Sequence, residues 1–134
     1  LRGTYILYVE DDDLVRASTC ALFDLFGIVY EQAASLDQVI RLVPNMERTP
    51  DVLVTDYRLP EGTTAKDVVD LVGEFFGPIP VLVVTGEVGG DELGFPAKCL
   101  LRKPLSSEQL LRAIVDAVGN RHPPIGGSGA WRRI

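Results

Sequence analysis

The sequence predicts an α/β fold with a parallel sheet, and three observations support this class. Five β-rich runs alternate with segments of helical periodicity along the chain. Residues 52–55 and 80–84 are continuous runs of β-forming residues without polar alternation, which is typical of strands buried on both faces of a parallel sheet. Four of the runs are followed by an acid, a hydroxyl or a lysine, at the place where open α/β sheets bind ligands.

The first strand and helix are predicted from residues 4–27. The β-rich run 4–9 stops at four consecutive acids, residues 10–13, and Gly27 ends the helix that follows. Apolar residues recur at helical spacing in this segment and predict the face that packs on the sheet: Leu14, Ala17, Ala21, Leu22 and Leu25. Residues 28–30 form the second expected strand. A capping box at 35–38 opens a short helix through Val43, which Pro44 closes.

The second half of the chain continues the alternation. The strand 52–55 ends at Asp56, and a loop leads to a helix over 65–76 with an inward face of Val68, Val69, Val72 and Phe76. The strand 80–84 runs into Thr85, and the Gly-rich, acidic segment 86–98 has room for a helix of about two turns near 91–93. Residues 99–101 form the fifth strand. A capping box at 106–109 opens a last helix with a buried stripe of Leu110, Ile114, Ala117 and Val118.

Composition limits the number of domains, the class of ligand and the cellular compartment that we expect. The 134 residues are 46% hydrophobic and 24% charged, which suits one globular domain, expected over residues 1–119, with a Pro/Gly-rich tail over 120–134. The net charge of −6 argues against direct nucleic-acid binding by this domain. Two cysteines without motif spacing, Cys20 and Cys99, are expected to be buried apolar residues of a reducing compartment. With no long apolar run, we expect a cytoplasmic domain without membrane contact.

The first residue and the last five residues of the sequence lead to two further expectations. The chain begins at Leu1 rather than Met, which we interpret as a processed or excised piece of a longer protein. The tail ends in Ala-Trp-Arg-Arg-Ile, where residues 131–133 suggest a docking element, although a disordered terminus is the favoured interpretation.

The polar groups after the strands form the candidate site. Glu10 and Asp11 follow the first strand, Asp56 the third, Thr85 the fourth and Lys103 the fifth, so all are expected at one edge of the sheet. Clustered carboxylates repel by roughly 4 kcal/mol per pair at about 4 Å with an effective dielectric near 20, so they must protonate, separate or share a cation. Mg²⁺ matches a site of acids without His or Cys ligands. The ammonium and the hydroxyl suit a phosphoryl group, so Asp56 is predicted to be a nucleophile that forms an aspartyl phosphate.

Plainer interpretations exist for each residue taken alone. Asp12 or Asp13 caps the first helix, and Asp56 could be a turn former. Lys103 could form a structural ion pair, Thr85 could be a loop hydroxyl, and the lone histidine, His122, is a solvated residue of the tail. The convergence of four strand ends is what favours a functional site.

These motifs together resemble the receiver domain of two-component response regulators, over about residues 4–119. The matching pieces are ILYVEDDDLVR, VLVTDYRLP, VLVVTG and LLRKPL. The resemblance implies the flavodoxin-like receiver fold with sheet order 2-1-3-4-5, the order known for a chemotaxis receiver. It implies that Asp11, Asp56 and the backbone carbonyl of Arg58 ligate Mg²⁺ directly, that Glu10 acts mostly through water, and that Asp56 receives the phosphoryl group.

The resemblance also implies partners. The donor would be a histidine kinase or a histidine phosphotransfer domain, and a weak homodimer is compatible with the family. The compact segment 86–98 and the LLRKPL ending look most like the receiver module of a hybrid histidine kinase. One departure affects the output: Leu100 occupies the position of the family's switch aromatic. We therefore expect Thr85 to act as the trigger and segment 86–98 to carry the conformational change.

Two competing functions remain at this point. A phosphohydrolase of haloacid-dehalogenase type would use Asp11, since residues 11–15 satisfy its first motif, but the later acidic motif is missing. A phosphorylation-independent, degenerate receiver would be expected to lack the acceptor or the lysine, and both are present.

Overall fold

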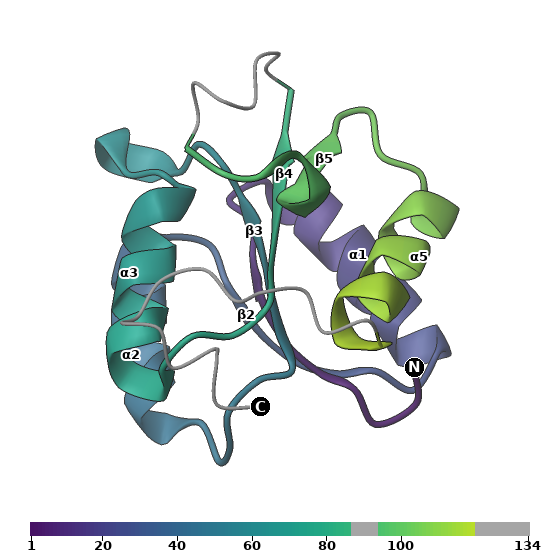
Figure 1. Ribbon diagram of the computed structural model, residues 1–134, viewed down its shortest axis with the longest axis horizontal. Coiled ribbons are helices and arrows are strands. Elements are labelled where there is room, and N and C mark those ends of the chain that lie inside the picture. Colours follow the sequence, from purple (N-terminus) through teal and green to yellow (C-terminus); the bar gives the residue numbers. More distant parts are fainter. Residues whose placement is uncertain (87–93, 120–134) are drawn as a thin grey trace.

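The computed structural model describes residues 1–86 and 94–119, which form a layered α/β arrangement (Figure 1). Five strands make one parallel sheet in the order β2-β1-β3-β4-β5. The predicted fold class and strand order are confirmed. The strands are β1 (Tyr5–Val9), β2 (Val29–Ala33), β3 (Val52–Asp56), β4 (Val81–Thr85) and β5 (Leu100–Arg102).

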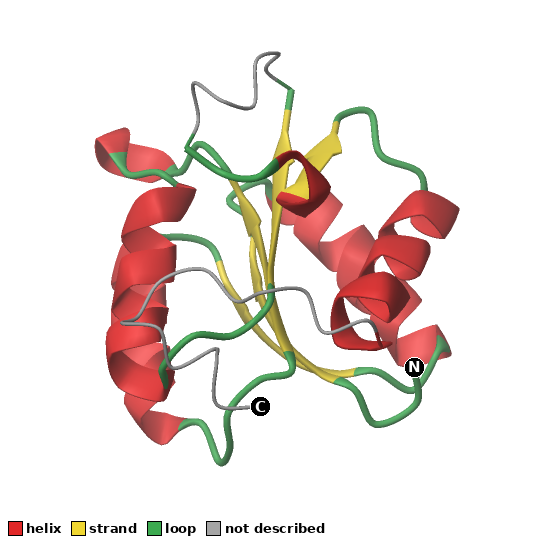
Figure 2. Cartoon of the chain, viewed as in Figure 1, coloured by secondary structure: helices red, strands yellow, loops and turns green. Residues whose placement is uncertain are grey.

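Helices cover both faces of the sheet, as Figures 1 and 2 show: α2 and α3 lie on one side and α1 and α5 on the other. The helices are α1 (Asp13–Leu25), α2 (Leu36–Leu42), α3 (Ala65–Phe76) and α5 (Ser107–Gly119), with short 3₁₀ turns η1 (Val43–Asn45), η2 (Pro60–Gly62) and η3 (Ala97–Cys99). The short helix expected near residues 91–93 falls outside the described residues. Within the described ranges, no helix is long and apolar enough to cross a membrane.

Two apolar cores hold the sheet between its helices. Every residue of β1, β3 and β4 is buried, as the continuous β-forming runs predict for central parallel strands. Side chains of these strands alternate between a core under α2 and α3 and a second core under α1 and α5. The carboxyl ends of the three strands are therefore fixed on both sides, which gives the residues that follow them a rigid support.

The capping signals position the helices where the sequence places them. Ser35 Oγ accepts a hydrogen bond from the Gln38 amide at 3.2 Å, and Ser106 Oγ accepts one from the Gln109 amide at 3.1 Å. A further capping box, which was not predicted, joins Thr64 and Asp67 at the start of α3. The bounds and inward face of α3 agree with the prediction.

The predicted inward face of α1 is wrong. Leu14 and Leu25 are 79% and 74% exposed, whereas Cys20 and Phe23 are buried. Leu14 and Phe23 are nine residues apart, which places them about 180° apart around a helix of 3.6 residues per turn. The Phe23 ring packs edge-on against Tyr8 and against Tyr30, with centroids 5.6 and 5.7 Å apart, so aromatic packing on the sheet sets the rotation of the helix.

Three smaller boundaries also differ from the prediction. The edge strand β2 runs over Val29–Ala33 rather than 28–30, because all five residues pair with β1. The helical segment does not end at Pro44. After α2 it continues as the 3₁₀ turn η1, which tolerates proline in its first turn. Cys99 belongs to η3, where its amide donates to the Pro96 carbonyl at 2.9 Å, and β5 starts one residue later. Both cysteines are buried and unpaired, as expected.

Candidate functional site

Four strand ends bring the predicted site residues to one edge of the sheet. Glu10 directly follows β1, Asp56 is the last residue of β3, Thr85 is the last residue of β4, and Lys103 directly follows β5. Because the strands are parallel, their carboxyl ends meet at the same edge, where open α/β sheets bind ligands.

The loop between β1 and α1 sorts its four acids into different positions. Asp12 caps α1: its Oδ1 accepts hydrogen bonds from the amides of Leu14 and Val15 at 2.9 and 3.0 Å. Glu10 is only 3% exposed, and its Oε2 accepts the Asp12 amide at 3.0 Å. Asp11 is exposed beside it. The helix cap therefore accounts for Asp12, while Glu10 and Asp11 stand next to Asp56.

Arg16 is a positioning residue that was not predicted from the sequence. Its guanidinium donates to the backbone carbonyl of Glu10 at 2.8 Å and to Gln32 Oε1 at 3.1 Å, and it pairs with Asp13 at 2.8 Å. These bonds tie the acidic loop to α1 and to β2. Its spacing of three residues from Asp13 on a predicted helix was the available signal.

Asp56 is a buried carboxyl in an acidic environment. It is 4% exposed, and burial together with a hydrogen bond and charge repulsion from Glu10 raises the pKa of Asp56 to about 8. The ammonium of Lys103 lies 3.4 Å from Asp56 Oδ1 and opposes this rise in pKa. The lysine side chain is 46% exposed, so solvent screens the pair on one side. Without a cation, the ionised form of Asp56 is thus disfavoured.

The donor set fits a hard divalent cation. Glu10, Asp11 and Asp56 each offer a carboxylate oxygen, and these oxygens lie within 4.8 Å of one another. Two of the three side chains are buried, so their mutual repulsion is poorly screened and a shared cation would relieve it. Oxygen ligands of this kind match Mg²⁺.

The remaining predicted residues surround this cluster. Thr85 is 5% exposed, and its carbonyl accepts the Lys103 amide at 2.8 Å, which couples the loops after β4 and β5. Arg58 is exposed in the loop after β3 and forms an isolated bridge with Thr64. Ligation by its carbonyl stays a prediction.

Leu100 is the first residue of β5 and pairs with Val83 of β4. It is partly buried and packs against the core under α2 and α3, which contains the buried Phe95 and is also contacted by Tyr57. Phe95 is an aromatic residue of the segment following β4 to which the sequence alone assigned no role. Phe95 and Leu100 therefore hold the described residues 94–100 against the sheet through apolar contacts.

Comparisons with known proteins agree on the fold. No protein-family model and no curated protein matches the sequence. Among solved structures, a response regulator receiver domain protein from Clostridium thermocellum is 22% identical with a TM-score of 0.75, over 88% of this chain and 96% of that chain. The receiver domain of the hybrid histidine kinase CckA is 22% identical with a TM-score of 0.70, over 85% and 98% of the two chains.

A third similar structure contains a metal. The receiver domain of a sensor histidine kinase from Pseudomonas aeruginosa PAO1 has a magnesium ion coordinated in its active-site cleft. It is 23% identical to this chain with a TM-score of 0.73, over 87% of this chain and 98% of that chain. The fold of this chain is that of response-regulator receiver domains.

Proposed function

We propose that this chain is a phosphoacceptor signalling domain that takes a phosphoryl group onto Asp56 in a Mg²⁺-dependent reaction and then changes conformation. The donor is a histidine kinase or a histidine phosphotransfer protein in the cytoplasm, and the domain acts alone or as the receiver module of a hybrid kinase. One observation carries the proposal. A buried carboxyl at a strand end lies between two further carboxylates and an ammonium 3.4 Å away.

The residues divide the chemistry between them. An ionised Asp56 oxygen attacks phosphorus, the bond from phosphorus to the donor atom breaks, and the leaving group keeps the bonding electrons. Glu10, Asp11 and Asp56 would hold Mg²⁺, which when bound supplies positive charge that offsets the charge of the acids and the phosphoryl oxygens. Lys103, which is paired with Asp56, and Thr85, the last residue of the neighbouring strand β4, would contact the transferred phosphoryl group.

The resting ion pair and the buried threonine also supply a switch. Once a phosphoryl group is attached, Lys103 and Thr85 gain a new acceptor, and Thr85 already shares a backbone hydrogen bond with Lys103. Movement of one loop would therefore be transmitted to the other. This supports the expectation that segment 86–98 carries the output, although residues 87–93 of that segment lie outside the described residues.

The solvent face of α1 gives the partner a place to bind. Leu14 and Leu25 are strongly exposed on this helix, which begins next to the acidic loop, and Ala17 and Ala21 lie between them. An apolar stripe of leucine and alanine suits packing against a helix. We therefore place the helical surface of a histidine-bearing donor on this stripe, whose Leu14 end adjoins the acidic loop.

A small phosphodonor tests the phosphoacceptor function without any partner. Incubation with acetyl phosphate and Mg²⁺ is expected to add a single phosphoryl group, detected by intact-mass analysis, and omission of the divalent cation should prevent it. A phosphohydrolase would instead release phosphate over many turnovers and would depend on Asp11. Sustained release that survives Asp56→Asn and is lost in Asp11→Asn would replace the proposal by that alternative. Two observations favour the phosphoacceptor over the phosphohydrolase. Asp13, which belongs to the phosphohydrolase motif at residues 11–15, is paired with Arg16, and Asp56 is buried.

The partner surface makes a separate prediction. Leu25→Lys should slow transfer from a phosphorylated histidine phosphotransfer domain about tenfold, since losing one buried leucine at an interface costs about 1.5 kcal/mol or more. Labelling by acetyl phosphate should not change. The matched control is Ile40→Lys, because Ile40 is 47% exposed on α2, on the opposite side of the sheet. Equal slowing by both substitutions would show that α1 is not the docking surface.

A further inference from the structure

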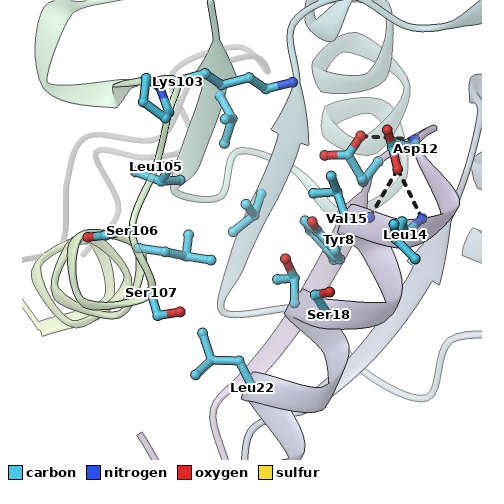
Figure 3. Close-up of a pocket in the computed structure, with 16 residues that line it drawn as sticks. Tyr8, Asp12, Leu14, Val15, Ser18, Leu22, Lys103, Leu105, Ser106 and Ser107 are labelled. Carbon is cyan, nitrogen blue, oxygen red and sulfur yellow. Dashed lines mark hydrogen bonds between the residues drawn. The ribbon is translucent and has the colours of Figure 1, made fainter.

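The apolar groove between α1 and α5 has no role in the proposed phosphotransfer. Its volume is about 540 Å³, which is within the usual range for pockets that bind small molecules. Figure 3 shows Val15 and Ser18 of α1 on one side, facing Leu105 and Ser107 on the other. The lining is mainly apolar: Leu14, Val15, Leu22, Val54, Val84, Leu105 and Leu110.

The floor of the groove is built from the central strands. Tyr8, Val54 and Val84 line it, and none of the three is more than 8% exposed. The same side chains belong to the core under α1 and α5, and the Tyr8 ring packs edge-on against Phe23 with centroids 5.6 Å apart. The floor is therefore fixed by core packing, so the groove is pre-formed, as small-molecule sites usually are.

The size of the groove suits a small molecule better than a partner helix. A helix with its side chains is about 10 Å wide, and a cylinder of that width fills the groove's volume of about 540 Å³ over only about 7 Å. That length is little more than one helical turn. A helix that packs on α1 would thus lie mostly outside the groove, whereas a molecule with one ring and a short chain fits inside it.

The lining carries a net negative charge beside the acidic loop. Glu10 and Asp12 contribute two negative charges and Lys103 one positive charge, which leaves −1 over the described residues that line the groove. Asp12 is fixed in place, because its Oδ1 accepts hydrogen bonds from the amides of Leu14 and Val15 at 2.9 and 3.0 Å. Figure 3 shows Asp12 at the end of the groove opposite Leu22. An occupant with an apolar body and a positive charge at one end matches this surface.

We propose that the groove binds amphipathic organic cations, whose aromatic or alkyl group lies between α1 and α5 and whose ammonium group pairs with Asp12. The occupant also covers Leu14, which belongs both to the groove and to the apolar stripe of α1. A bound cation therefore competes with the histidine-bearing donor for α1. This consequence rests on the proposed function, but the binding site itself does not, because it requires no phosphorylation of Asp56.

Phenylbutylammonium is a probe that tests the site in the full chain. The titration is followed by amide NMR in EDTA without a phosphodonor, so its failure would leave the proposed function standing. Saturable shift changes are expected at Val15, Ser18 and residues 105–110, with a Kd of about 1 mM, which is reasonable for a ligand of this size. Phenylbutanol has the same apolar body without the charge and should bind about three- to fivefold more weakly, the range for one partly exposed ion pair.

A change of charge tests the contact with Asp12. Asp12→Asn keeps the helix cap, because asparagine caps as well as aspartate, and it should at least halve the preference for phenylbutylammonium over phenylbutanol. The matched control is Asp37→Asn, which removes an acid from the first turn of α2 on the other side of the sheet and should leave the preference unchanged.

A change of volume tests the apolar part of the site. Ser18→Trp places a large side chain in the lining and should abolish binding of both probes, at little cost to the fold since Ser18 is exposed. Ala17→Trp makes the same addition at the neighbouring exposed position outside the lining and should leave binding intact.

Four results would overturn the proposal. Equal affinity for the two probes would remove the role of the charge, and equal loss of binding in the two tryptophan variants would remove the role of the groove. Shift changes confined to Glu10, Asp11 and Asp56 would place the probe on the acid cluster instead. Shifts along α1 that grow with protein concentration in the absence of a probe would assign the groove to a second copy of the chain.

Discussion

Asp56→Asn is expected to stabilise the metal-free domain at pH 8 by roughly 5 kcal/mol. Burial and the proximity of Glu10 raise the pKa of Asp56 to about 8, whereas the unfolded chain has the ordinary value of 3.8. Between these two values the folded state binds more protons than the unfolded state. Stability conferred by the neutral carboxyl is therefore fully present below about pH 4 and is lost as the pH rises toward 8.

Urea unfolding in EDTA at pH 5 and pH 8 measures this effect. The stabilising effect of the asparagine should be clearly larger at pH 8, because the wild-type carboxyl must then ionise in its buried position. Mg²⁺ should stabilise the wild type more than the variant, since the variant has lost one carboxylate ligand. A variant that is less stable than the wild type at pH 8 in EDTA would show that Asp56 tolerates its charge through contacts other than a cation.

Phe23→Ala is expected to destabilise the domain by about 3–5 kcal/mol, the usual range for a phenylalanine lost from a well-packed core. Phe23 is fully buried and contacts the rings of Tyr8 and Tyr30. Leu14→Ala is the matched control on the same helix and should change stability by less than about 0.5 kcal/mol, because Leu14 is 79% exposed.

Equilibrium unfolding of the two variants decides which side of α1 faces the sheet. Comparable destabilisation by both substitutions would mean that the leucine stripe contributes to the core. That result would contradict the packing described for α1 and would also remove the basis for placing a partner on its exposed face.

Most of the fold could be predicted because its signals are local or topological. Continuous β-forming runs predict central parallel strands, and the capping boxes at Ser35 and Ser106 fix where two helices begin. The alternation of strands and helices then predicts a parallel sheet. The strand order itself came from the resemblance to receiver domains, not from the patterns of the residues.

The orientation of α1 could not be predicted from periodicity. The helix carries apolar residues on two faces, and the leucine stripe contains more of them than the face with Cys20 and Phe23. A prediction from hydrophobic content alone therefore assigns the leucine stripe to the face that packs on the sheet. Tertiary packing selects the other face, since the Phe23 ring meets aromatic side chains from β1 and β2 that come from other elements of the chain.

In the candidate site, too, some features could be predicted from the sequence and others depend on tertiary packing. Sequence placed Glu10, Asp56, Thr85 and Lys103 at strand ends, and the parallel sheet brings them to one edge. The sequence did not indicate that Arg16 holds the Glu10 backbone, because that bond depends on the rotation of α1. The repulsion among the acids could be predicted, but the sequence did not show that the Asp56 side chain is itself buried, which is the main cause of its raised pKa.

The central claim is that Asp56 accepts the phosphoryl group, and chemical mapping of the modified residue tests it most directly. Borohydride reduces an aspartyl phosphate to homoserine, so peptide sequencing by mass spectrometry identifies the acceptor after treatment with acetyl phosphate and Mg²⁺. The account predicts homoserine at position 56 and unmodified aspartate at 11, 12 and 13. Homoserine at position 11, or a phosphorylated chain with aspartate intact at position 56, would contradict it.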